Sequence, residues 1–270
     1  MNRSRWKLYL FLAVGLAFLY IPVLLLVIYS FNESRLVTVW SGFSTKWYGE
    51  LLHNRQLLDA AWLSVRIAAT NATFAVILGT LAANALVRHG NFRGRTGFQL
   101  LLAAPLVMPE VITGLSLLLL FVTMEHTVGW PAGRGFTTIT IAHITFSTAF
   151  VAVVVRSRLS QMDRSLEEAA MDLGARPLRV YMSITLPLIA PALLSGWLLA
   201  FTLSLDDLVI SSFVAGPGST TLPMVVYSSV RMGVSPQINA LASIVVLIVS
   251  VAVLIAGLLS MRQQPAAKAN

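Results

Sequence analysis

Six stretches of predominantly apolar residues, each long enough to cross a membrane, dominate this sequence. A hydrocarbon core of about 30 Å needs roughly 20 helical residues to cross it. We therefore expect transmembrane helices near residues 8–31, 62–87, 98–122, 137–155, 188–214 and 238–261. The sequence predicts an all-α polytopic membrane protein with six transmembrane helices, organised as a single transmembrane domain over residues 1–270.

The composition supports this class and excludes soluble alternatives. Apolar residues make up 57% of the chain and charged residues only 11%, whereas charged residues make up about 25% of a typical soluble domain. So few charges cannot cover a soluble surface, and so many apolar residues exclude a disordered chain. The chain has no cysteine, which excludes disulfides, thiolate zinc sites and cysteine nucleophiles.

The distribution of positive charge predicts the orientation in the membrane. There are 19 Lys and Arg against 11 Asp and Glu, a net charge of +8, which in a soluble domain would raise the possibility of nucleic-acid binding. Most of the basic residues lie before the first span, in the links after the second and fourth spans, and after the sixth: Arg3, Arg5, Lys7, Arg88, Arg93, Arg95, Arg156, Arg158, Arg164, Arg176, Arg179, Arg262 and Lys268. Because Lys and Arg in short loops mark the cytoplasmic side, both termini are predicted to be cytoplasmic, and no nucleic-acid partner is expected.

The first apolar stretch and the longest external link each predict a helix. The first apolar stretch is longer than the roughly 7 to 15 apolar residues of a signal peptide and lacks a small-residue cleavage site, so we expect an uncleaved helix. The longest external link, about residues 32–61, carries Trp40, Phe43, Trp47 and Leu51 at helical spacing. This spacing predicts a short interfacial helix.

The link between the fourth and fifth spans has a clear internal design. Over residues 163–187, Ser165 followed three residues later by Glu168 predicts a capping box and hence a helix start. Gly174 is placed to end that helix, and Pro177 suits the first turn of another. The sequence predicts a short helix, a turn and a second helix.

The short helix of this loop has a small apolar face. That face is formed by Leu166, Ala169, Ala170 and Leu173, with Glu167, Glu168 and Asp172 off it. One interpretation is an amphipathic connector that lies on the membrane. The other is a docking element, because central alanines allow close approach of another protein and the flanking acids would be repelled by anionic lipid.

Three acids are predicted to lie inside the membrane: Glu110, Asp206 and Asp207. An ionisable group in a span costs about 2.5–3.5 kcal/mol on insertion scales, so each is a functional candidate. Unpaired carboxylates facing a cavity would suit a cation pathway. The alternatives are structural: the aspartates could cap or hydrogen-bond a neighbouring helix or bind a partner's arginine, and Glu110 could be protonated and bonded to backbone freed at a kink.

Helical geometry predicts how the two aspartates point. In a continuous fifth helix, Asp207 shares a face with Ser204 and Ser211, whereas Asp206 lies about 100° away. In the third span, Pro105 and Pro109 are expected to bend the helix just before Glu110, because each proline lacks an N–H and clashes with the preceding turn.

No histidine pattern predicts a metal or a proton relay. His143 is interpreted as a buried, hydrogen-bonded histidine of the fourth span, and the other histidines show no ligand spacing. No metal site and no cofactor are expected.

The loop residues carry a family resemblance. Glu168, Ala169, Ala170, Gly174, Ile184, Leu186 and Pro187 match the EAA loop, E-A-A-x3-G-x9-I-x-L-P, of the membrane subunits of bacterial ABC importers. The resemblance implies the type I importer permease fold and a coupling helix that docks on a cytoplasmic ATPase subunit. It therefore implies that Glu168, Ala169, Ala170, Gly174, Leu186 and Pro187 form the coupling element.

A wider resemblance narrows the substrate. The segments APLVMPEVITGLSLLLLF and LAFTLSLDDLVISSFVAGPGSTTLPMVVYSSVRMGVSPQINAL, with the loop, resemble the second permease subunit of polyamine importers, most of all that of the putrescine system. This resemblance runs from Tyr20 to Leu241. It implies import of putrescine or spermidine from periplasm to cytoplasm by alternating access, with Asp206, Asp207 and Glu110 along the substrate pathway.

The resemblance also implies partners and a location. It implies a bacterial inner-membrane complex with a homologous second permease subunit, two ATP-binding subunits and a periplasmic polyamine-binding protein. The chain has no G-x-x-x-x-G-K-[ST] motif for nucleotide phosphates, so ATP hydrolysis is assigned to the partner and the chain is expected not to be an enzyme.

Three alternatives stay open at this point. One is an ABC importer permease for another cation or an amino acid. A second is a proton-coupled secondary carrier that uses Glu110 and the aspartates as proton sites. The third is an intramembrane enzyme, which is disfavoured because no Ser-Lys, H-E-x-x-H or paired catalytic aspartate motif with suitable flanking residues is present.

Overall fold

The computed structural model describes residues 3–35, 39–232 and 236–262, and within these ranges the regular secondary structure is helical, with one isolated bridge between Asn32 and Phe43. The chain divides into two compact units, Met1–Leu58 with Val226–Asn270, and Asp59–Val225. The predicted all-α class is confirmed.

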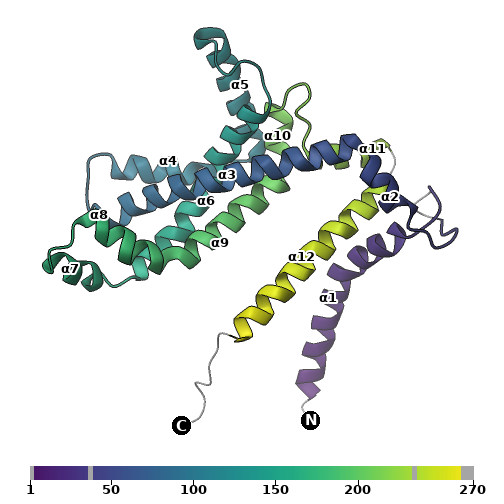
Figure 1. Cartoon of the computed structure of the whole chain (residues 1–270), viewed down its shortest axis with the longest axis horizontal. Helices are drawn as coiled ribbons and strands as arrows, with labels where there is room; N and C mark the ends of the chain where they lie inside the picture. The colour runs from purple at the N-terminus through teal and green to yellow at the C-terminus, as the bar shows by residue number, and fades with distance from the viewer. Residues whose placement is uncertain (1–2, 36–38, 233–235, 263–270) are drawn as a thin grey trace. The chain divides into compact units, whose positions relative to one another are not determined.

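The first unit pairs the two ends of the chain. It contains α1 (Arg3–Ser30), α2 (Lys46–His53) and α12 (Pro236–Arg262), and α12 packs on both α1 and α2 (Figure 1). The short helix predicted in the long link is α2, which buries Trp47 and Leu51. Trp40 and Phe43 lie before α2 begins, so the helical spacing predicted for them is wrong. Trp6–Ser30 is strongly apolar with none of its most apolar window buried in the chain, so this surface is suited to lipid or to another subunit.

The loop between α1 and α2 is held by one buried asparagine. The Asn32 side chain donates to the Val39 carbonyl (2.7 Å) and accepts from the Ser41 N–H (3.0 Å), and the Trp47 indole donates to the Asn32 carbonyl (2.6 Å). These bonds satisfy polar groups that would otherwise be buried without partners.

The second unit contains most of α3 (Arg55–Arg88) and then α4 (Arg95–Val107), α5 (Glu110–Val128), α6 (Phe136–Gln161), α7 (Ser165–Asp172), α8 (Pro177–Val180), a π-helix (Tyr181–Thr185), α9 (Leu186–Leu205) and α10 (Val209–Val214). A further helix, α11 (Leu222–Met232), begins in this unit and continues beyond its last residue, Val225. In this unit α9 packs on α6, α5 packs on α10, and α4 packs on α6.

The core of this unit relies on small residues and one buried amide. A Cβ at Gly79 of α3 would lie 2.8 Å from Val151 Cγ1 of α6, so only glycine permits this close approach. The Asn71 amide of α3 donates to Ser147 Oγ of α6 (3.1 Å) and to the Ala200 carbonyl of α9 (2.8 Å). Three helices are therefore joined at one point inside the apolar core.

Within the part of the chain that the structure describes, five helices are long and apolar enough to cross a membrane: Trp6–Ser30, Arg55–Arg88, Glu110–Val128, Phe136–Gln161 and Pro177–Leu205. The sixth predicted span corresponds to α12, of which Pro236–Val251 counts as a shorter apolar helix among the described residues. The predicted stretches are thus all helical, although two of them are not single helices.

The third predicted span, residues 98–122, is broken in its middle. Met108 is extended (ψ 135°) and Pro109 stands before α5, so α4 and α5 are separate helices that run in different directions (Figure 1). A residue before proline is disfavoured in the helical region, which explains why the break falls here, whereas Pro105 stays inside α4. The expected bend is in fact a complete break.

The fifth predicted span, residues 188–214, is also wrong as a single helix. The helix begins earlier, at Pro177, and α9 ends at Leu205, with α10 starting only at Val209. Asp206 and Asp207 therefore lie in a helix break rather than on faces of one continuous helix.

Candidate functional site

The predicted coupling helix is present as α7. It begins at Ser165 as expected, but the capping box is wrong, because no side chain caps the helix from its N-cap residue Arg164. Instead Asp163 Oδ1 accepts the Ser165 N–H (3.0 Å). Hydrogen bonds from the Ser165 backbone and hydroxyl lower the pKa of the exposed Asp163 carboxyl, which therefore stays ionised at neutral pH.

The end of α7 follows the sequence prediction closely. Gly174 has φ +87°, a left-handed conformation that favours glycine. The Gly174 N–H donates to the Met171 carbonyl (2.9 Å) and the Ala175 N–H to the Ala170 carbonyl (3.1 Å), which is the Schellman pattern of helix termination. Pro177 then begins α8, as predicted.

The residues predicted to form the coupling element lie at two places in the structure. Glu168 and Ala169 are exposed, Ala170 is half-buried, and Leu173 is 90% exposed at the tip of the loop. An apolar side chain this exposed, beside an exposed carboxylate, is suited to contact with another protein. Leu186 and Pro187 lie apart from this tip, in the first turn of α9.

Glu167 faces the opposite way and was not singled out by sequence reasoning. It lines a hollow of about 580 Å³ between α7, the end of α3 and the α8 segment, together with Leu81, Asn84, Arg88, Arg164, Glu168, Met171, Pro177, Leu178, Val180, Tyr181, Met182 and Thr185. Arg88 forms an ion pair with Glu167 (2.9 Å). Because 79 positions separate these residues in the chain, no local pattern could have indicated the pair.

Asp207 is part of a buried polar cluster. Its Oδ2 lies 3.0 Å from Nε2 of His143 on α6, and its side chain is only 9% exposed. Nδ1 of His143 lies 2.7 Å from Ser204 Oγ, and Nε2 lies 3.1 Å from Ser211 Oγ. The interpretation of His143 as a buried, hydrogen-bonded histidine is confirmed, and Ser204, Asp207 and Ser211 do meet, although around a helix break.

Asp207 also holds the start of α10. Its carboxylate accepts the Ile210 N–H (3.2 Å) and the Ser211 N–H (2.7 Å). These N–H groups in the first turn have no partner within the helix. The geometry matches the structural alternative for this aspartate, which caps one helix and joins it to another.

Asp206 and Glu110 differ from Asp207 in their surroundings. Both side chains are exposed, and within the described residues neither forms an ion pair or a hydrogen bond to another residue's side chain. Glu110 stands at the first position of α5, directly after the break at Pro109. The structure therefore joins Asp207 to His143 and leaves the other two acids accessible.

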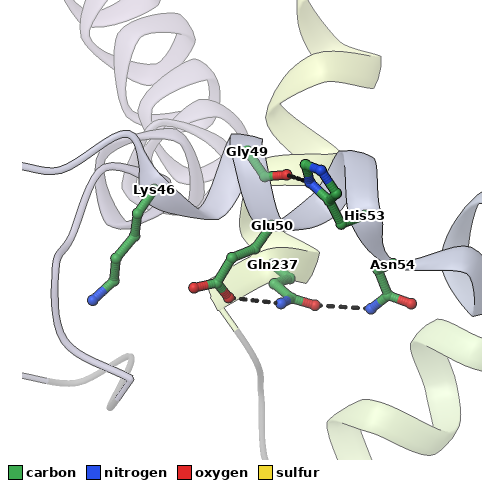
Figure 2. A pocket seen from close by; sticks show the side chains of 6 residues that line it. All are labelled: Lys46, Gly49, Glu50, His53, Asn54 and Gln237. Atoms are coloured by element: carbon green, nitrogen blue, oxygen red, sulfur yellow. Dashed lines mark hydrogen bonds between the residues drawn. The ribbon is translucent and has the colours of Figure 1, made fainter.

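A polar hollow lies in the first unit, on the predicted external side. It has a volume of about 500 Å³ and is lined by Lys46, Gly49, Glu50, His53, Asn54 and Gln237 (Figure 2). Gln237 donates to Glu50 Oε2 (3.0 Å) and accepts from the Asn54 amide (2.9 Å). The Glu50 carboxylate is thereby engaged in joining α2 to α12.

No group of three or more His, Asp or Glu suited to a metal ion occurs among the residues described.

Comparisons with known proteins agree with this geometry. Residues 75–268 match the family described as binding-protein-dependent transport system inner membrane component. The chain is 65% identical over 243 residues to the putrescine transport system permease protein PotI of Escherichia coli K12, covering 90% of this chain and 86% of that protein. It is 43% identical over 254 residues to the spermidine/putrescine transport system permease protein PotC of the same strain, covering 94% and 93%.

Solved structures share the fold. A bacterial ABC transporter involved in the import of the acidic polysaccharide alginate matches with a TM-score of 0.69 and 16% identity, covering 98% of this chain and 99% of that one. The MetNI methionine ABC transporter in inward-facing conformations matches with a TM-score of 0.59 and 16% identity, covering 76% and 94%. The predicted importer permease fold is confirmed.

Proposed function

The chain belongs to the family of inner membrane components of binding-protein-dependent transport systems, and from this premise we propose that it carries putrescine or a related polyamine through the inner membrane. The observation that carries the substrate class is the 65% identity to a putrescine permease over 90% of the chain. The fold neighbours are only 16% identical. The chain acts as a transport subunit, and an ATPase partner hydrolyses ATP.

Membership of this family supports three kinds of partner. A homologous second permease subunit completes the pathway, two ATP-binding subunits dock from the cytoplasm, and a periplasmic binding protein delivers the polyamine. The exposed tip of α7, with Glu168, Ala169 and Leu173, supports the ATPase contact. Glu168 is expected to pair with a basic residue of the ATPase, since charge complementarity fixes the register of such contacts.

The proposed mechanism is alternating access. Binding of ATP closes the ATPase dimer, which displaces α7, and the transmembrane helices open outward to receive the polyamine. Hydrolysis resets them inward. Gly174 gives α7 a sharply defined end, so a push on the helix moves a compact element rather than an extended loop.

The acids are assigned different parts in the substrate pathway. Asp206 and Glu110 are accessible carboxylates, which attract the ammonium groups of a polyamine in surroundings of low dielectric constant. Two dispersed carboxylates bind a dication and can still release it. Asp207 serves the pathway by holding the break in which Asp206 stands, since its own carboxylate is already engaged by His143 and α10.

Substrate-stimulated ATP hydrolysis tests this proposal. The purified complex, with its binding protein, is assayed with putrescine, spermidine, lysine and an uncharged sugar. Putrescine or spermidine is expected to stimulate hydrolysis and the sugar to have no effect. Stimulation by lysine alone would assign the complex to amino acid import, and no stimulation by any cation would overturn the polyamine assignment.

A further inference from the structure

The Glu167 carboxylate joins three helical segments at one oxygen atom. Oε1 accepts from Arg88 Nη2 (2.9 Å) at the last residue of α3 and from Thr185 Oγ1 (2.6 Å) at the last residue of the π-helix. The side chains of Arg88 and Glu167 are only 14% and 15% exposed. Hydrogen bonds to an ionised group in such sheltered surroundings are roughly twice as strong as neutral ones.

The end of α3 is also tied to its surroundings by two other arginines. Arg164, just before α7, donates to the Val87 carbonyl (2.6 Å). Arg95, the first residue of α4, donates to the Leu86 carbonyl (3.0 Å) and the Gly90 carbonyl (2.7 Å). Cations at a helix C-terminus satisfy free carbonyls and interact favourably with the helix dipole, so Arg164 ties the start of the loop to the end of α3, and Arg95 ties α4 to it.

The third segment held by Glu167 is an unusual one. The π-helix Tyr181–Thr185 interrupts the helical run from Pro177 to Leu205. Such π turns are rare and often lie at functional sites. Thr185 is buried, with 1% exposure, and its hydroxyl bond to Glu167 ties the turn directly to α7.

We propose that Glu167 is the positioning residue that transmits the movement of α7 to α3 and α9. This inference rests on the proposed importer function, in which Glu168 faces outward to the ATPase while Glu167 faces inward. When α7 is displaced, its carboxylate pulls Arg88 and Thr185 together. Because Asn71 joins α3 to α9 inside the core, the two helices then move as one body.

Loss of Glu167 separates these elements without removing the ATPase contact. Within the described residues Arg88 Nε is already buried without a hydrogen-bond partner, so Glu167→Ala leaves the guanidinium poorly satisfied as well as unpaired. The guanidinium can then turn away from α7. The expected defect is hydrolysis without transport rather than loss of assembly.

The first experiment measures polyamine molecules imported per ATP hydrolysed by the reconstituted complex. Mutation of residues that carry coupling between sites changes it about 2- to 30-fold, so Glu167→Ala is expected to lower this ratio by at least about twofold while the ATPase subunits still co-purify. Glu167→Gln retains an acceptor oxygen and is expected to be intermediate. Asp172→Ala removes an exposed carboxylate from the same helix and should match the wild type.

The second experiment measures whether α7 and α3 move together. The chain has no cysteine, so spin labels at His89→Cys and Asp172→Cys report their distance by electron paramagnetic resonance with and without ATP. The distance should be the same in both states of the wild type and in Glu168→Ala. It should broaden or shift in Glu167→Ala.

The outcomes separate this inference from the proposed function. A wild-type transport ratio and one narrow distance in Glu167→Ala would overturn the inference while polyamine transport stands. A wild-type complex that ignores polyamines would overturn the proposed function, and the distance measurement would still decide the role of Glu167. If the complex with Glu167→Ala fails to assemble, Glu167→Gln decides. A wild-type transport ratio and a wild-type distance in Glu167→Gln would count against a role for the charged Glu167 carboxylate.

Discussion

Replacing Asp207 with alanine is expected to destabilise the protein by about 1–4 kcal/mol. The carboxylate accepts two N–H groups of the first turn of α10 and contacts His143 of α6. Loss of a helix cap costs about 0.5–2 kcal/mol, and a hydrogen bond between transmembrane helices contributes about 0.6 kcal/mol on average and up to about 1.7. Asp207→Asn retains a capping oxygen and should cost less than about 1 kcal/mol, because Asn caps helices nearly as well as Asp.

The matched control is the neighbouring residue. Asp206 is exposed, so Asp206→Ala should leave the free energy of unfolding within about 0.5 kcal/mol of the wild type while raising the polyamine concentration needed for half-maximal transport. The free energy of unfolding is measured by steric trapping in bicelles, and transport by uptake of labelled putrescine. Wild-type stability in Asp207→Ala together with abolished transport would refute the structural assignment of Asp207.

Three further perturbations test other parts of the structure. Glu168→Arg should weaken co-purification of the ATPase subunits by about 30-fold or more, since a mismatched charge at an interface costs about 2–5 kcal/mol; undiminished co-purification would count against docking at α7. In Gly174→Ala the added Cβ meets no atom within 4 Å, but the residue must hold φ +87°. The resulting strain of about 1–2 kcal/mol should speed hydrogen exchange at the end of α7 about fivefold or more. Unchanged exchange would contradict the assigned helix end. Gly79→Ala places a Cβ 2.8 Å from Val151 Cγ1 and should destabilise by about 1–3 kcal/mol, with much of the loss recovered by Val151→Ala; simple additivity of the two losses would exclude the clash.

The sequence predicts best what local physics decides. Apolar length alone locates the helices, because a bilayer leaves backbone groups no partner outside a helix or barrel. The end of α7 follows from Gly174, since few other residues adopt its backbone conformation, and the start of α8 follows from Pro177. These features depend on residues within one turn of each other.

The sequence fails where distant residues decide. Nothing in LSLDDLV breaks a helix by itself, and the break after Leu205 is stabilised by the bond of Asp207 to His143, 64 positions away. The proline before Glu110 predicts a bend, but the direction of α5 depends on its packing against α10. Ser165 and Glu168 satisfy the capping-box pattern, in which the Glu168 side chain would accept the Ser165 N–H. In the structure the Asp163 carboxylate accepts this N–H instead.

The different surroundings of Glu167 and Glu168 also could not be predicted from the sequence. Glu167 and Glu168 are adjacent in sequence and both lie off the apolar face expected for α7. Only the fold shows that Glu167 turns inward to Arg88 while Glu168 remains exposed. Likewise, the position of Arg88 in the sequence indicates only the cytoplasmic side of the membrane, whereas the structure shows its ion pair with Glu167.

ATP-driven import of a polyamine is tested by the uptake of labelled putrescine into proteoliposomes that contain the whole complex. With the binding protein outside and ATP inside, putrescine is expected to accumulate against its gradient, to do so equally in the presence of a protonophore, and to stop when ATP is replaced by a non-hydrolysable analogue. Uptake that persists without ATP and collapses with the proton gradient would contradict ATP-driven import and identify a secondary carrier.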